Sequence, residues 1–356
     1  MSIIVGSLVY GLCWASADIT PALSRDALTR LGERLFFDAR LSRDRAVSCA
    51  TCHRPEVAFA EGRPKSLGTG GRIGLRNAPS LLDVGSQRTL FWDGRQVTLE
   101  AQAVEPLINP TEHGLGDHGE VVRILATSSD YPVEFKEAFG AGQPAISVRR
   151  VGQALAAYQR TLKTGPAPVD RFLRGDESAL TPRARAGWQT FSGVAACIRC
   201  HTPDQRSSPG GRPLFTDHDF HAIGIGQERI ARLLPVLVPT VARERAAGVS
   251  ADKLILDNPE VASLGRFVVS ADIADLGKFR TPGLRNVALT APYMHDGSIR
   301  TLREAVDHEV YYRGRADGRP LILTPQELDD LVLFLEEALT TRQPPLRARS
   351  TRVKPR

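Results

Sequence analysis

Two short cysteine and histidine motifs constrain this chain more than any other feature: CATCH at residues 49–53 and CIRCH at residues 197–201. Two thiols three positions apart on one turn can each add to a vinyl group of a haem, and the histidine that follows can reach the iron. A structural zinc site, a redox dithiol and chance are the alternatives. Zinc-binding cysteine pairs are usually about 15–20 residues apart, whereas these pairs lie in different halves of the chain. The repeat of the whole motif counts against coincidence.

The sequence therefore predicts two c-type haems. We expect covalent attachment at Cys49, Cys52, Cys197 and Cys200. The proximal iron ligands are expected to be His53 for the first haem and His201 for the second.

The N-terminus has the pattern of a secretory signal peptide. The first 17 residues hold no charged side chain, and an apolar run from Ile3 to Trp14 precedes a small-x-small cleavage pattern that ends at Ala17. No Lys or Arg precedes the run, which departs from the usual pattern. The run is too short to span a bilayer, so we expect cleavage before Asp18 and export to the periplasm.

The formal net charge of +6 does not indicate nucleic-acid binding. Six positive charges lie after Glu337 with no acidic residue among them, at Arg342, Arg347, Arg349, Arg352, Lys354 and Arg356. Without this segment the protein is close to neutral. We expect residues 342–356 to be a disordered basic tail, to which we assign no function.

Helical periodicity dominates the rest of the sequence, and strand signals are scarce. Apolar residues recur at helical spacing after Pro21 and again over residues 148–162, and Thr324-Pro325-Gln326-Glu327 has the form of a capping box. Pro106 is expected to close a short helix, and Pro239 to interrupt another. The fold class predicted is all-α, with two cytochrome-c-like haem domains and extensive loops.

A length of 356 residues suits two domains, each with one haem motif. The segment 163–169 contains two prolines and is the natural link between them. We expect an N-terminal peroxidatic haem domain over residues 18–163. A C-terminal electron-transfer haem domain is expected over residues 164–341.

Further motifs resemble those of the bacterial diheme cytochrome c peroxidase family, which includes the MauG-type enzymes. Besides the two haem motifs they are RNAPS (76–80), FWDGR (91–95), LEAQA (99–103), NPTEHG (109–114), FHAIG (220–224) and LRNVALTAPYMHDGS (284–298). They occur in the family's order and cover nearly the whole mature chain. The resemblance is specific for the superfamily and less specific for the substrate.

The resemblance implies a peroxide site at the first haem. Glu112 matches the family's distal acid, which can take a proton from bound hydrogen peroxide and return it to the leaving oxygen. Gln102 matches the amide that helps to position peroxide. Typical members carry a histidine on the glycine-rich loop that blocks this face until reduction, but the matching residue here is Thr69. We therefore expect the first haem to be five-coordinate without prior reduction.

The resemblance also implies an electron relay and a cation site. Trp92 matches the indole that lies between the haems, although a core aromatic is the common alternative. Asn77, with the backbone carbonyls of Thr290 and Pro292, matches a calcium site between the domains.

The sixth ligand of the second haem is where the chain departs most from its relatives. Typical members use a methionine, but the ungapped match is Glu309. MauG-type members use a tyrosine, and a shifted alignment puts Tyr311 there, with Tyr312 as a further alternative. We expect Tyr311 to bind, which would lower the potential of this haem relative to methionine ligation.

The expected function is that of an exported diheme peroxidase. Hydrogen peroxide would be reduced to water with electrons from a small redox protein, a cytochrome c or a cupredoxin. The alternative is a MauG-like oxidase that modifies a residue, most simply a tryptophan, of a partner protein. A homodimer is left open, and no nucleic-acid partner is expected. A plain electron carrier would not need Glu112 and Gln102.

Overall fold

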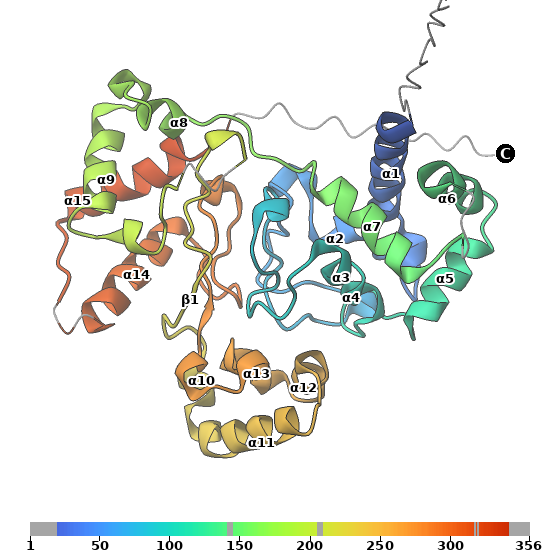
Figure 1. The fold of residues 1–356 in the computed structure, drawn as a ribbon. Coiled ribbons are helices and arrows are strands. Elements are labelled where there is room, and N and C mark those ends of the chain that lie inside the picture. The colour runs from blue at the N-terminus through green and yellow to red at the C-terminus, as the bar shows by residue number, and fades with distance from the viewer. Residues whose placement is uncertain (1–19, 141–144, 205–208, 317, 319, 342–356) are drawn as a thin grey trace, which may run out of the picture.

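The computed structural model describes residues 20–140, 145–204, 209–316, 318 and 320–341. Within these ranges the protein is mostly helical, with a single two-stranded sheet (Figure 1). The predominantly helical class expected from the sequence is thus confirmed. No helix in the described ranges is long and apolar enough to cross a membrane. The predicted signal peptide, residues 1–17, and the predicted basic tail, residues 342–356, lie outside the described residues.

The first core cluster is built around a close crossing of two helices, α1 (Thr20–Phe37) and α7 (Val148–Gln159). Leu35 of α1 and Leu155 of α7 are almost completely buried there. The helices approach so closely that a Cβ atom on Gly32 would lie 1.9 Å from the carbonyl oxygen of Ala154. Both helices were predicted from apolar spacing, and Leu31, Leu35, Val151 and Leu155 of that pattern are buried in this cluster.

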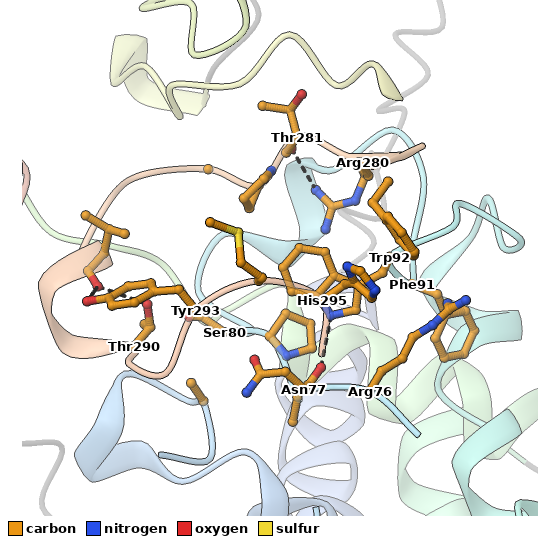
Figure 2. Close-up of a pocket in the computed structure, with 18 of the residues that line it drawn as sticks. Arg76, Asn77, Ser80, Phe91, Trp92, Arg280, Thr281, Thr290, Tyr293 and His295 are labelled. Atoms are coloured by element: carbon orange, nitrogen blue, oxygen red, sulfur yellow. Dashed lines mark hydrogen bonds between the residues drawn. The ribbon is translucent and has the colours of Figure 1, made fainter. Parts of the chain in front are cut away.

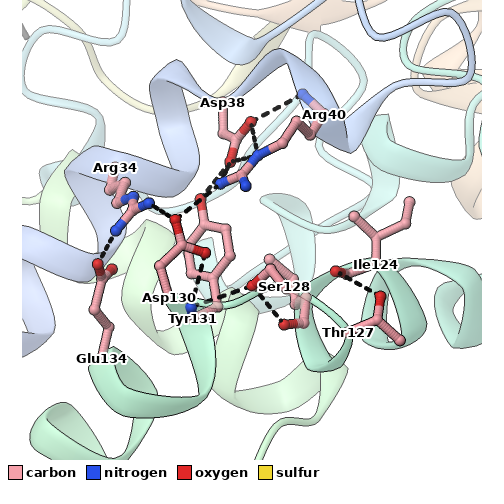
Figure 3. A network of polar contacts seen from close by, with 10 residues as sticks. Arg34, Asp38, Arg40, Ile124, Thr127, Ser128, Asp130, Tyr131 and Glu134 are labelled. Carbon is pink, nitrogen blue, oxygen red and sulfur yellow. Dashed lines mark hydrogen bonds and ion pairs between the residues drawn. The ribbon is translucent and has the colours of Figure 1, made fainter. Parts of the chain in front are cut away.

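A polar network fixes α6 (Tyr131–Phe139) against the end of α1 (Figure 3). Arg34 of α1 forms ion pairs with Asp130 and Glu134. The Tyr131 hydroxyl donates a 2.5 Å hydrogen bond to Asp38, which follows α1. Because Tyr131 is also buried in the first core cluster, the network joins the polar surface to the apolar core.

The second core cluster is also built around a close crossing of two helices, α9 (Pro182–Ser192) and α15 (Pro325–Leu333). A Cβ atom on Gly187 would lie 1.9 Å from the carbonyl oxygen of Asp330. Trp188 of α9 packs its ring 5.5 Å from that of Phe334, in the π-helical turn Phe334–Ala338 that continues α15. The predicted capping box is confirmed, since Thr324 N donates to Glu327 Oε2 at 2.7 Å.

A third core cluster lies between the two strands in sequence. Strands β1 (Phe220–His221) and β2 (Phe279–Arg280) pair antiparallel. The intervening chain forms α10 (Gln227–Ile230), α11 (Leu234–Ala246), α12 (Ala251–Asp257) and α13 (Phe267–Ser270), drawn below the rest of the molecule in Figure 1. These four helices share an apolar core of their own.

Two predictions about proline were wrong. Pro239 lies inside α11, which continues without a break and buries Leu237 and Val241 on either side of it. The burial of these side chains compensates for the single backbone hydrogen bond that Pro239 cannot donate. Pro106 does not close a helix but lies in the first turn of α4 (Glu105–Ile108), where the missing N–H has no intrahelical partner.

The remaining helices are short or line the surface of the cores. They are α2 (Cys49–Cys52), α3 (Leu99–Gln102), α5 (His118–Ala126), α8 (Pro168–Phe172) and α14 (Leu302–Ala316).

A buried arginine, Arg285, holds the segment 163–169 that connects the first and second core clusters. Arg285 forms an ion pair with Asp170 at 2.8 Å, and both side chains are at most 2% exposed. Its Nε also donates to the Thr164 hydroxyl at 2.9 Å. The first cluster ends at Leu162 and the second begins at Ala167. We retain a domain boundary between residues 163 and 164 as a proposal.

Candidate active site

The first motif holds its histidine in the orientation that an iron ligand needs. Cys49 and Cys52 lie on α2 and form no disulfide. The His53 N–H donates to the carbonyl of Cys49 at 2.9 Å, and ring atom Nδ1 lies 3.1 Å from the carbonyl oxygen of Phe59. A proton on Nδ1 makes this hydrogen bond and leaves Nε2 with a free lone pair. Burial lowers the pKa of His53 to about 4, so the imidazole is neutral at physiological pH.

The second motif repeats this arrangement on an unrelated segment. The His201 N–H donates to the carbonyl of Cys197 at 2.9 Å, and Nδ1 lies 3.0 Å from the carbonyl oxygen of Phe215. Burial lowers the pKa of His201 as well. Cys197 and Cys200 form no disulfide. Both motifs thus present a neutral imidazole beside two free thiols.

A single cavity of about 520 Å³ joins the two motifs. Its wall includes Cys52 and His53 from the first motif and Cys197, Cys200 and His201 from the second. Most of the remaining lining is apolar, as expected for a porphyrin pocket. The free thiols, the orientation of the imidazoles and the apolar wall fit two covalently attached haems.

Two further side chains beside Cys200 could suggest a metal site instead. His221 Nε2 lies 2.8 Å from Asp217 Oδ2, and the ligand atoms of these residues and Cys200 lie within 4.8 Å of one another. A thioether bond to haem would remove the thiolate that such a site requires. In the sequence, His221 stands out only as part of FHAIG and Asp217 belongs to no motif, because their proximity to Cys200 arises only in the folded chain.

Glu112 and Gln102 both line the cavity, as the peroxide-site prediction requires. The Glu112 carboxylate accepts a 2.7 Å hydrogen bond from Asn109 Nδ2. Burial raises the pKa of Glu112 to about 7, and the nearby Arg95 guanidinium opposes this effect. Glu112 can therefore both accept and release a proton near neutral pH. Gln102 ends α3 on the wall of the same cavity.

The glycine-rich loop packs behind Glu112 and not into the cavity. The Thr69 N–H donates to the Glu112 carbonyl at 2.7 Å, and the Thr69 side chain is buried against Gly114, where a Cβ would lie 2.4 Å from Thr69 Cγ2. Thr69 is absent from the cavity wall. Apart from the two motif histidines, the histidines found on that wall in the described chain are His221 and His295.

Trp92 lies on the cavity wall between residues of both halves (Figure 2). Its indole Nε1 donates to the carbonyl of Asn77 at 2.9 Å, and the Asn77 N–H donates to the carbonyl of His295 at 2.8 Å. The Trp92 carbonyl accepts a 2.8 Å hydrogen bond from the Arg280 N–H. These bonds fix the indole against chain segments that precede and follow the second haem motif.

The three residues expected to bind calcium all line this cavity: Asn77, Thr290 and Pro292. The Asn77 amide nitrogen donates to the carbonyls of Arg63 and Pro64 at 2.9 and 3.4 Å. This leaves the Asn77 amide oxygen as the atom available to a cation. The calcium site stays a proposal.

Helix α14 does not bring Tyr311 into the cavity. The side chain of Tyr311 is 58% exposed and is not part of the cavity wall. Tyr312 also lies off the wall, and its ring packs on Gly224. Glu309 of the same helix does line the cavity, and burial raises its pKa to about 7. The preference for Tyr311 as the sixth ligand is therefore not supported by its placement.

Comparison with known proteins agrees with the motifs. Residues 26–178 match the family model described as di-haem cytochrome c peroxidase. The chain is 35% identical over 313 residues to the methylamine utilization protein MauG of Methylorubrum extorquens, covering 86% of this chain and 76% of that protein. It is 34% identical over 333 residues to the cytochrome c551 peroxidase of Pseudomonas aeruginosa, covering 92% and 83%.

Among solved structures, a MauG-like protein associated with microbial copper homeostasis aligns with a TM-score of 0.70 and 32% identity, covering 89% of this chain and 90% of that one. These relatives include proteins named as peroxidases and proteins named MauG. The two haem motifs, the shared cavity and the similarity over most of the sequence lead to one conclusion: the chain belongs to the di-haem cytochrome c peroxidase family, which includes the MauG proteins.

Proposed function

We propose that the protein reduces hydrogen peroxide to water at the first haem site. The observation that carries the proposal is Glu112, a buried carboxyl on the cavity wall whose pKa of about 7 suits proton transfer at neutral pH. The reaction consumes one hydrogen peroxide, two protons and two electrons and yields two water molecules. When bound, the haem attached at Cys49 and Cys52 would supply an iron that binds peroxide and passes the two electrons to it.

The role of Glu112 is to move one proton between the two peroxide oxygens. The ionised carboxylate takes the proton from the oxygen nearer the iron and returns it to the farther oxygen, which leaves as water. The Asn109 amide, at 2.7 Å, holds the carboxylate in position. Gln102 would hold the peroxide or the departing water by hydrogen bonds, because its amide can both donate and accept.

The two electrons would come from a small redox protein, a cytochrome c or a cupredoxin, and enter through the second haem. Trp92 would relay them, and its hydrogen bond to Asn77 supports this role because a fixed indole keeps one geometry during transfer. His53 and His201 would be the proximal iron ligands. Asn77, Thr290 and Pro292 would hold a calcium ion beside this route.

We also propose that the protein is exported to the periplasm. The support is the apolar leader over residues 1–17 and the pair of covalent haem motifs.

A second candidate function is MauG-like oxidation of a partner protein, with tryptophan as the residue modified. Two observations favour it. No methionine projects from α14 onto the cavity wall, and Thr69 replaces the loop histidine of typical peroxidases. An oxygen ligand on the second haem would lower its potential and make it a poor acceptor of electrons from an ordinary cytochrome c.

The Glu112→Gln variant tests the proposed proton transfer. It should keep both haems, because neither motif is touched, and lose peroxide turnover by roughly 100-fold to 10,000-fold, the usual contribution of a general acid–base group. Glu137→Gln, at an exposed glutamate of α6, is the matched control and should retain turnover. Full activity in Glu112→Gln would refute the role of this residue.

Two parallel assays separate the two functions. Steady-state oxidation of reduced cytochrome c by hydrogen peroxide reports the peroxidase. Mass spectrometry of proteins from the native host, treated with the enzyme and peroxide, reports an oxidised tryptophan in a partner. Modification of a partner together with negligible cytochrome c oxidation would overturn the first proposal in favour of the second.

A further inference from the structure

The two polar side chains of α14 on the cavity wall are Glu309 and Arg313, and Glu309 is the one that can donate an electron pair to a metal. We propose that the Glu309 carboxylate, and not a tyrosine, would be the second protein ligand of the second haem iron, besides His201. The proposal rests on the second haem being attached at Cys197 and Cys200, but not on the peroxide reaction.

Helix α14 has one face on the cavity. The residues of this helix that line the wall are Leu302, Ala305, Val306, Glu309, Val310 and Arg313. They follow one another at the three- and four-residue spacing that keeps side chains on the same side of a helix. Tyr311 is two positions from Glu309, about 200° around the helix axis, and 58% of its side chain is exposed. Tyr311 could reach the cavity only if α14 rotated and withdrew Glu309.

Tyr312 is occupied by other contacts. A Cβ atom on Gly224 would lie 1.9 Å from the Tyr312 hydroxyl, so the phenol fills the space that only a glycine leaves free. The Tyr312 ring also packs 4.6 Å from the ring of His308, whose Nε2 lies 2.8 Å from the carbonyl oxygen of Ile223. Tyr312 thus anchors α14 to the FHAIG segment.

The buried Glu309 carboxylate has no hydrogen-bond partner among the described residues, although the charges of Arg313 and His221 act on it. No residue in the described ranges forms a hydrogen bond or ion pair with it. Its neighbours on the helix face, Val306 and Val310, are apolar. A charged oxygen in such surroundings is costly unless it is paired or binds a metal. Arg313 lies one helical turn after Glu309 on α14. Its guanidinium donates to the carbonyl of Ala196 at 2.5 Å and therefore points toward the second haem motif.

Glu309 also lies in the correct half of the cavity. Val306 and Val310 belong to the second core cluster together with Cys197. The hydrogen bond from Arg313 to Ala196 joins α14 to the residue directly before Cys197. The other cavity-lining donors of this region are less suited: His221 Nε2 is held by Asp217 at 2.8 Å, and the Tyr293 hydroxyl donates to the carbonyl of Val287 at 3.1 Å. Met294 remains, and the experiment below includes it.

A carboxylate ligand has a definite consequence for redox chemistry. A hard, anionic oxygen donor stabilises ferric iron over ferrous iron and so lowers the midpoint potential relative to a thioether. The second haem would then give up electrons to the first haem readily but accept them slowly from a donor of ordinary cytochrome potential.

The test uses full-length holoprotein with its haem content measured by pyridine haemochrome. Low-temperature EPR and spectroelectrochemistry are recorded for wild type, Glu309→Gln, Glu309→Met and Tyr311→Phe. We expect Glu309→Gln to change the second haem's signal and raise its midpoint potential while the first haem's signal stays the same. Glu309→Met should produce a near-infrared methionine–iron band, and Tyr311→Phe should match wild type.

Three results would overturn the proposal: an unchanged second-haem signal in Glu309→Gln, a changed one in Tyr311→Phe, or a changed one in a Met294→Leu variant. If the Glu309 variants fail to retain two haems, resonance Raman spectroscopy of the wild type identifies the ligand instead. Phenolate–iron vibrations would show a tyrosine ligand and refute the proposal. Their absence, with no methionine–iron band, would support it. Peroxidase activity is not the readout, so failure here is distinguishable from failure of the proposed peroxide reaction.

Discussion

The pH dependence of peroxide turnover should report the ionisation of Glu112. Burial raises its pKa from the ordinary value of 4.5 to about 7. Only the ionised form can take the first proton from peroxide, so about one molecule in ten is competent at pH 6 and about nine in ten at pH 8. We therefore expect kcat/KM for peroxide to rise roughly tenfold between these values. Stopped-flow reaction of the reduced protein with limiting peroxide would measure it.

The Asn109→Asp variant provides a second test of the pKa of Glu112. The change keeps the oxygen that accepts the Thr111 N–H at 2.9 Å but removes the donor that holds Glu112 at 2.7 Å. A hydrogen bond to a charged group contributes about 1.5–3 kcal/mol, which corresponds to a pKa rise of about one to two units at 1.36 kcal/mol per unit. The rising part of the pH profile of kcat/KM should move to higher pH by about one to two units. A flat profile between pH 6 and 8 in wild type, or an unshifted one in Asn109→Asp, would refute the reasoning.

Three other measurements test the fold and the electron route. Gly187→Ala forces a Cβ to 1.9 Å from a backbone carbonyl oxygen and should lower the free energy of unfolding in urea by about 1–3 kcal/mol. Gly119→Ala, at an exposed position of α5 where the new Cβ would lie 3.0 Å from the Asp117 side-chain oxygen, is the milder control and should cost less than about 1 kcal/mol. Equal effects would contradict the close helix crossing. Arg285→Ala leaves the buried Asp170 carboxylate unpaired and should lower the free energy of unfolding in urea by about 3–5 kcal/mol. A decrease below about 1 kcal/mol would argue against the Arg285–Asp170 ion pair. Trp92→Phe should slow electron transfer between the haems, measured by stopped-flow spectra, without loss of haem. Trp188→Phe, a packing change in the second core cluster, should leave the transfer rate at its wild-type value. Equal transfer rates in the two variants would exclude the relay.

Local sequence patterns were sufficient for the features that depend on neighbouring residues. The capping box at Thr324 forms as predicted, because it depends only on residues within one helical turn. The haem motifs are equally local, because attachment needs only two thiols and an imidazole on one turn. The prediction about Pro239 was wrong because tertiary burial, which a local rule does not include, outweighs one missing hydrogen bond. The prediction about Pro106 was wrong because this residue lies in the first turn of α4, where no intrahelical hydrogen bond is lost.

By itself, the sequence determined the family, and it predicted the haem ligands and the acid of the proposed peroxide site. Only the tertiary structure decided which side chains face the cavity. Glu309 and Tyr311 are two positions apart in sequence, yet the packing of Tyr312 on Gly224 sets the rotation of α14, and with it the inward glutamate and the exposed tyrosine. The same holds for His53 and His201, whose orientation depends on carbonyl groups at Phe59 and Phe215. Side-chain direction depends on contacts made by residues distant in sequence, and these exist only in the folded chain.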